Sequence, residues 1–228
     1  MIRTSVLAFF LVLMAAAVHA QQVRIPYQLS LGVGYLASYG DWIGVQDEEG
    51  EGPDSVWSQG SGNTRIAIDG TINMGARRRF GLGLAYRRFG PDNGYAINGV
   101  GPVIAWTNPY SANVVSQWML AGGYASLAVD DVGLDDSVYN DISYGASFGA
   151  FFELQWRLAF PVIDLTEFSN GQALRLAPHF GLATGAAFTA REVDFETLPG
   201  DEQDYFLYVD NFNTTISLGV TLMVMDED

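Results

Sequence analysis

Residues 142–158 read ISYGASFGAFFELQWRL, and every second side chain in this stretch is apolar. The even positions carry Ile, Tyr, Ala, Phe, Leu and Trp, whereas the odd positions are mostly Ser, Gly, Glu, Gln and Arg. Side chains of an extended strand point alternately to its two faces, so this period of two predicts a strand with one apolar and one polar face.

The same alternation recurs along the chain. It is strong again over 27–39, where Tyr, Leu, Val and Ala at odd positions alternate with Gln, Ser and Gly. Weaker versions occur at 65–74, 80–89, 100–106, 118–127, 174–186 and 212–224. The sequence therefore predicts eight strands, and an even number places both ends of the chain on the same side of a sheet that closes into a barrel.

The predicted connections alternate in length. Long connections at 40–64, 90–98, 128–140 and 187–206 are separated by short ones at 75–79 and 107–113. Outer-membrane barrels have long external loops and short periplasmic turns in this order. The connection 159–173 is longer than the rule predicts, so we expect a small hairpin or helix there, or a different strand count.

The polar face distinguishes a membrane barrel from a soluble one. A soluble lipocalin-type barrel also has eight alternating strands, but its water-facing side is rich in charged residues. In this chain the polar side is Gly, Ser, Ala, Gln and Asn with a few isolated charges. Small residues suit the crowded lumen of an eight-stranded barrel, so the apolar side is predicted to face lipid.

Aromatic residues are predicted to form two bands at the two membrane interfaces, as Tyr and Trp do in such barrels. The inner band contains Tyr27, Phe80, Trp106, Tyr110, Trp118 and Trp156. The outer band contains Tyr39, Trp42, Tyr86, Phe89, Tyr124, Tyr144 and Phe206.

The first twenty residues are predicted to be a signal peptide. A short basic start, Met1–Arg3, precedes an apolar run from Val6 to Val18, and Val18-His19-Ala20 has small residues at the spacing of a cleavage site. We expect residues 21–228 to form one outer-membrane β-barrel domain. Because the chain has no cysteine, no disulfide holds it together.

The chain carries 26 acidic and 11 basic residues, and all of the basic ones are Arg. Such acidity makes nucleic acid a poor partner. Most of the acids fall in the four long connections, which predicts acidic external loops and an extracellular ligand of unknown identity. Expected partners are outer-membrane lipid and the assembly machinery of that membrane, and no cofactor is expected.

In its signal peptide, eight alternating strands and acidic loops, the chain resembles the small bacterial outer-membrane barrels of the OmpA, OmpX and OmpW type. The resemblance implies an all-β, eight-stranded, antiparallel up-and-down transmembrane barrel in the bacterial outer membrane. One feature departs from it, because such proteins usually end in an aromatic residue and this chain ends Val224-Met225-Asp226-Glu227-Asp228.

A polar network is predicted in the lumen. Asp69 is expected near Arg87, diagonally across the tight turn 75–79, and counting back through 159–173 puts Glu153 roughly across from His179. An acid–base pair for hydrolysis would use Glu153 and His179, but a structural network that fills the lumen is the preferred interpretation. The complete predicted network is Arg65, Asp69, Arg87, Glu153, Arg157, Arg175 and His179.

Asp130, Asp131, Asp135 and Asp136 are weak candidates for a hard cation, and a solvated acidic surface is the preferred interpretation. The leading functional prediction is a non-enzymatic outer-membrane barrel with a structural or interaction role and a plugged lumen. The alternatives are a narrow channel for small or hydrophobic solutes, which the OmpW resemblance implies, and third an enzyme that modifies outer-leaflet lipid.

Overall fold

The computed structural model describes residues 23–47, 56–60, 63–75, 79–90, 95–129, 142–195 and 205–227. These residues form ten strands in one sheet. The strands are β1 (Val23–Asp47), β2 (Val56–Gly60), β3 (Asn63–Met74), β4 (Phe80–Gly90), β5 (Tyr95–Ser111), β6 (Val114–Val129), β7 (Ile142–Ala159), β8 (Ile163–Glu167), β9 (Gln172–Phe195) and β10 (Tyr205–Glu227). No helix in these ranges is long and apolar enough to cross a membrane.

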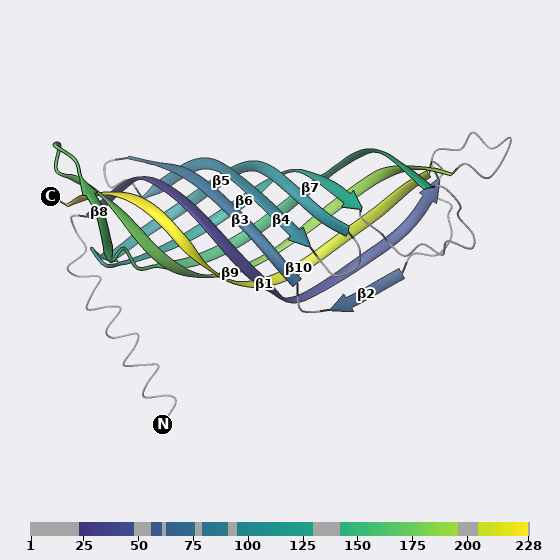
Figure 1. The fold of residues 1–228 in the computed structure, drawn as a ribbon, viewed down its shortest axis with the longest axis horizontal. Helices are drawn as coiled ribbons and strands as arrows, with labels where there is room; N and C mark the ends of the chain where they lie inside the picture. The colour runs from purple at the N-terminus through teal and green to yellow at the C-terminus, as the bar shows by residue number, and fades with distance from the viewer. Residues whose placement is uncertain are drawn as a thin grey trace, which may run out of the picture.

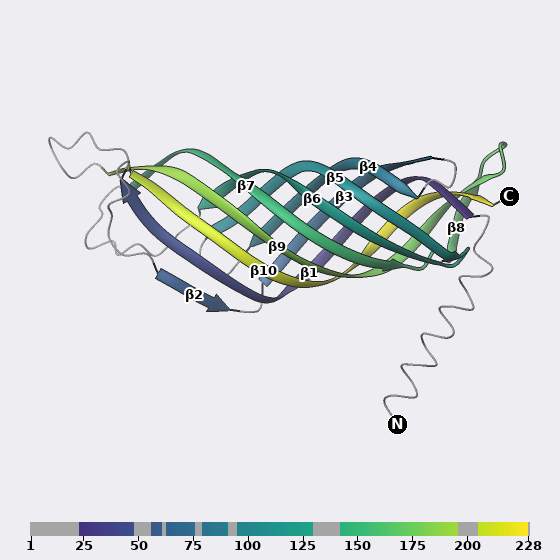
Figure 2. The same cartoon turned by 180° about the vertical axis from the view of Figure 1, so that it is seen from behind.

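Eight of the described strands close into an antiparallel barrel (Figures 1 and 2). The order around the barrel is β1, β3, β4, β5, β6, β7, β9 and β10, and β10 pairs with both β9 and β1. Each of the eight predicted strands lies within one of these, so the predicted up-and-down barrel is confirmed.

Two short strands extend the barrel wall. β2 continues the line of β3 along β1, because Tyr39 lies opposite Gly60 in the same register that places Leu36 opposite Asn63. β8 continues the line of β7 along β9 and turns back through 168–171. The long connection 159–173 therefore contains the small hairpin that was one of the expected explanations.

The strands are longer than predicted, mostly at one end of the barrel. We call the end where β1 starts and β10 finishes the terminal end, and the opposite end the loop end. At the loop end β1, β9 and β10 reach Asp47, Phe195 and Tyr205. On this side the barrel wall is tallest, as Figure 1 shows where these strands run beyond β3 and β4.

The outer surface of the barrel is apolar. Leu29, Leu84 and Leu218 are 53%, 69% and 68% exposed, and they point away from the lumen with the other alternate residues of their strands. Exposed aliphatic and aromatic side chains around a closed sheet form a surface suited to hydrocarbon. The predicted orientation, with the apolar face outward, is the one that the structure has.

One predicted aromatic position is wrong. Phe89 was expected in the outer aromatic band, but it is only 1% exposed and points into the lumen. Its neighbour Arg87 is also inward, since both follow the alternation of β4. Tyr124, which was placed in the same band, is 50% exposed on the outer face.

Candidate functional site in the barrel lumen

The lumen is crossed by a network of charged side chains that starts at Glu153 on β7. This carboxylate is fully buried and accepts hydrogen bonds from Arg65 of β3 and Arg87 of β4. Arg65 Nε lies 2.8 Å and Arg87 Nε 2.6 Å from the carboxylate oxygens, and Arg65 Nη2 makes a further short contact. One acidic side chain thus holds two guanidinium groups that reach it from the far side of the barrel.

The second carboxylate of the network is Asp69 on β3. Arg87 Nη1 lies 2.7 Å from Asp69 Oδ1, and Arg157 Nη2 of β7 lies 2.7 Å from Oδ2. Arg157 also donates to the Ser30 hydroxyl of β1 at 2.5 Å. The two halves share Arg87, so five charged side chains from β3, β4 and β7 form one connected network.

The structure brings together five of the seven predicted network residues: Arg65, Asp69, Arg87, Glu153 and Arg157. Arg175 lies apart at the terminal end, where its Nε is 2.5 Å from Asp164 on β8. His179 is buried, and its Nδ1 lies 2.9 Å from the Thr221 hydroxyl rather than beside a carboxylate.

The predicted pairing of Glu153 with His179 is wrong. In the β7–β9 ladder His179 lies opposite Ala159, and Glu153 lies opposite Gly185. Glu153 is instead bound to Arg65 and Arg87, so its oxygens are engaged by cations. The geometry on which the hydrolase hypothesis was based is therefore not formed.

Apolar and polar layers lie on either side of the network. Towards the terminal end, Thr107 accepts hydrogen bonds from Gln28 at 3.1 Å and Gln117 at 3.2 Å. The end itself is packed with the buried residues Ile25, Val115, Ala159, Ala177, Met223 and Met225. We call the half of the lumen next to the loop end the loop half. It contains most of a larger apolar cluster, including Leu36, Phe89, Tyr95, Ile97, Leu127, Phe151, Leu207 and Val209.

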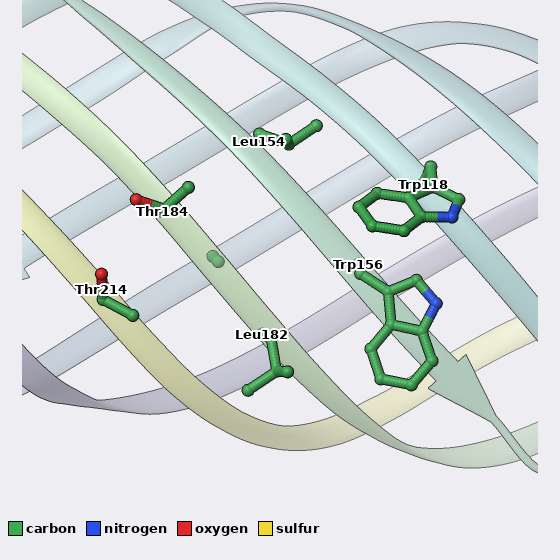
Figure 3. A pocket seen from close by; sticks show the side chains of 7 residues that line it. Trp118, Leu154, Trp156, Leu182, Thr184 and Thr214 are labelled. Carbon is green, nitrogen blue, oxygen red and sulfur yellow. The ribbon is translucent and has the colours of Figure 1, made fainter.

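The outer surface carries a shallow apolar groove over β6, β7, β9 and β10. It has a volume of about 310 Å³ and is lined by Trp118, Leu154, Trp156, Leu182, Ala183, Thr184 and Thr214. Figure 3 shows the two indole rings side by side at one end and the two threonines at the other. The polar atoms are engaged locally, since Trp156 Nε1 donates to Ser116 and Thr184 donates to the Asn213 carbonyl. This groove is part of the apolar outer surface.

The candidate metal ligands Asp130, Asp131, Asp135 and Asp136 lie outside the described residues. Within the described ranges, no group of three or more His, Asp or Glu side chains is arranged to hold a metal ion. The described part of the chain thus adds nothing to the cation hypothesis.

No protein-family model and no curated protein matches the sequence. Among solved structures, the chain is similar to the outer membrane protein OprG from Pseudomonas aeruginosa, with a TM-score of 0.54 at 10% identity over 92% of this chain and 100% of that one. The chain has the fold of a small outer-membrane β-barrel. Neisserial surface protein A is a more distant match, with a TM-score of 0.36 at 10% identity over 84% of this chain and 95% of that one.

Fold and surface together give the location. The barrel shares its architecture with a small outer-membrane protein, and its own outer face is a continuous apolar surface. A closed barrel satisfies every strand edge internally, as a membrane-spanning sheet must. The chain is an integral protein of the bacterial outer membrane, and the terminal end corresponds to the periplasmic side in such barrels.

Sequence reasoning missed parts of the lumen. Ser30 and Gln155 join the charged network but carry no signal beyond their inward phase on β1 and β7. The apolar loop half was also missed, because it was expected to be lined by small and polar residues. Phe89, Ile97 and Phe151 occupy inward positions, and the alternation of outward apolar residues gives no signal for how bulky or apolar an inward residue is.

Proposed function

We propose that this protein is a non-conducting outer-membrane barrel with a structural or interaction role. The observation that carries the proposal is the burial of the network at the centre of the lumen. Arg65, Arg87 and Glu153 are each fully buried, and Arg157 is 1% exposed. Water-filled pores leave their lining charges accessible, whereas these charges are enclosed by protein.

Four successive layers support a plugged lumen. An ion entering from the loop end meets the apolar cluster around Phe89 and Phe151, and it then meets the charged network. Below the network lie the Gln28–Thr107 layer and the apolar floor that contains Met223 and Met225. Passage would require an apolar layer to be wetted and four ion pairs to be broken at once.

With a plugged lumen, the surfaces available for function are the outer face and the loop end. The long connections at the loop end contain most of the acidic residues of the sequence. Under this proposal those acidic connections contact an extracellular partner, and a basic surface or a divalent cation would complement their charge. The barrel then serves as a rigid, membrane-embedded base for the loops.

Single-channel recording on purified protein in planar bilayers tests the plugged lumen. We expect no steady conductance steps from wild-type protein. The matched variant is Glu153→Gln, which releases one anchor of Arg65 and Arg87 and is expected to produce brief, flickering openings. Steady steps from the wild-type barrel would contradict the proposal.

A second candidate function rests on the apolar cluster in the loop half of the lumen. Leu36, Ile97, Phe151 and Val209 are all buried there, beside the tall wall formed by β1, β9 and β10. An apolar lining is suited to a hydrophobic solute that enters from outside, and such sites are typically concave and apolar. This candidate is a narrow conduit or binding site for hydrophobic molecules.

Binding of a fluorescent hydrophobic probe separates the two candidates. If the protein is a conduit for hydrophobic molecules, replacement of Phe151 by Glu in the apolar cluster is expected to abolish saturable binding of the probe. Replacement of the outward-facing Phe152 by the same residue serves as the position control, because it changes the lipid-facing surface only. Equal probe binding in all three proteins would exclude the loop half of the lumen as a binding site.

A further inference from the structure

The charged network does not balance its own charge. Its buried members are three arginines and two carboxylates, and these five, with His179, are the buried Arg, Asp, Glu and His residues of the described ranges. Arginine stays protonated in proteins because its pKa lies far above neutral pH. The network therefore carries one positive charge in excess, and a charge on His179 would only add to it.

The excess charge lies at a place where it is costly. Arg65 and Arg87 are fully buried and Arg157 is 1% exposed. A buried charge without a counter-ion is strongly unfavourable even after the protein relaxes around it, which is why buried ions are paired. Arg157 is close enough to both Arg65 and Arg87 to be repelled by them, so the three cations act on one another.

Each of the three arginines also has a buried N–H group with no hydrogen-bond partner in the described part of the chain. These groups are Arg65 Nη1, Arg87 Nη2 and Arg157 Nε. A fourth buried nitrogen without a hydrogen-bond partner in the described ranges is His179 Nε2, which is a donor in the tautomer that carries its proton there, and whose ring contacts Thr221 through Nδ1. Positive charge and unpartnered donors therefore occur together, on strands β3, β4, β7 and β9.

We propose that the network binds one small monovalent anion, such as a halide, inside the barrel. One such ion would neutralise the excess charge and accept hydrogen bonds from the unpartnered donors. Only a small ion suits the surroundings, because a Cβ added at Gly32 would lie 3.3 Å from His179 Nε2 and one added at Gly219 would lie 2.7 Å from His179 Cε1. The inference rests on the charge and donors of the network and does not depend on the function of the loops.

The test uses full-length mature protein refolded from urea into detergent micelles. Refolding takes place in sodium chloride, sodium bromide or sodium gluconate at equal ionic strength, so that the ion does not have to cross the apolar layers. The midpoint of thermal unfolding is read from the gel mobility of heated samples. Binding to the folded state alone raises this midpoint in a saturable way, and we expect a rise of a few degrees in chloride and bromide over gluconate.

Two variants remove the excess charge in opposite ways. Arg157→Gln deletes one cation and leaves two arginines facing two carboxylates. Gln155→Glu supplies an internal anion instead, because Gln155 Oε1 lies 3.5 Å from Arg65 Nη2. Both variants are expected to lose the halide response, and Gln155→Glu keeps the test valid if Arg157→Gln fails to fold.

Arg175→Gln is the matched control, since it removes an arginine that is paired with Asp164 outside the network. We expect it to retain the full halide response. Crystals grown in bromide provide a direct readout, with an anomalous peak within hydrogen-bond distance of the three arginines. Equal midpoints in all three salts, or an undiminished halide response in Arg157→Gln and Gln155→Glu, would overturn the proposal.

Discussion

Replacing Glu153 by Gln is the most informative test of the lumen network. The substitution keeps the size and shape of the side chain but removes its negative charge. Glu153 is the principal counter-ion of Arg65 and is shared with Arg87, and all three side chains are fully buried. After the change, three buried arginines face a single carboxylate, Asp69, so the excess positive charge rises from one to two.

The expected cost follows from this charge count. Removing one partner of a buried ion pair costs about 3–5 kcal/mol, because the remaining charge stays in a poorly solvating environment. With a urea dependence of about 2–3 kcal/mol per molar, this corresponds to a midpoint lowered on the order of 1–2 M. Water that enters the lumen beside the arginines would reduce the loss towards the lower end of that range.

The assay is urea unfolding in detergent micelles or lipid vesicles, followed by tryptophan fluorescence and by gel mobility. Glu167→Gln is the matched control, because Glu167 is exposed on β8. Exposed substitutions usually change stability by less than about 0.5 kcal/mol. The Glu153→Gln midpoint should therefore fall well below both wild type and control.

A double substitution tests whether the balance of buried charge, and not the loss of Glu153 alone, determines the stability. Arg65→Gln combined with Glu153→Gln restores the original excess of one charge, so it should be more stable than Glu153→Gln alone. Residues that share a network typically show interaction energies of about 0.5–3 kcal/mol. If Glu153→Gln unfolds at the wild-type midpoint, or if the two substitutions are simply additive, the ion pairs of Glu153 do not stabilise the barrel by balancing buried charge.

Three further predictions use the same unfolding assay. Leu84→Arg places a charge on an outward side chain that is 69% exposed and should cost about 2–4 kcal/mol in a bilayer; no loss in vesicles would contradict a lipid-facing surface. Gly75→Ala should cost about 1–2 kcal/mol, because Gly75 has a φ of 83° in the β3–β4 turn, and an unchanged midpoint would exclude strain there. Gly101→Ala should cost about 1–3 kcal/mol, since its Cβ would lie 2.2 Å from the Gly122 carbonyl oxygen. Gly90→Ala is its control, because a Cβ at Gly90 has space, and equal losses of stability in the two variants would refute the steric argument.

The number and phase of the strands could be predicted because hydrocarbon imposes one requirement on every outward residue. Leu29, Leu84 and Leu218 all satisfy it, so a period of two persists in the sequence wherever the wall crosses the membrane. Beyond the membrane this requirement ends. The last residues of β1, from Gly40 to Asp47, pair with β10 but mix polar and apolar side chains, so the predicted strand stopped at 39.

Predicting the contacts inside the lumen depended on the register between neighbouring strands, which is set by the connection between them. For β3 and β4 the turn is tight, so counting through it gave a useful prediction: Asp69 lies opposite Ala85, two positions from Arg87. For β7 and β9 the count treated the whole connection 159–173 as one turn. β8 instead continues the ladder and moves the turn to 168–171, which shifts the partner of His179 by six residues, from Glu153 to Ala159.

The inward residues of the loop half escaped prediction for a different reason. Lipid selects the outward side chains of every strand, but the lumen accepts any set that fills its volume and satisfies its polar groups. Phe89 and Phe151 fill that volume with carbon, while Arg87 and Glu153, two residues away on the same strands, fill it with charge. An outer-membrane barrel closes its backbone hydrogen bonds without help from the lumen, so the lumen is free to hold a charged network, and a bound anion would balance the excess charge of that network. The three arginines therefore occupy positions whose residue type the barrel fold does not dictate, and a specific function is to be sought there.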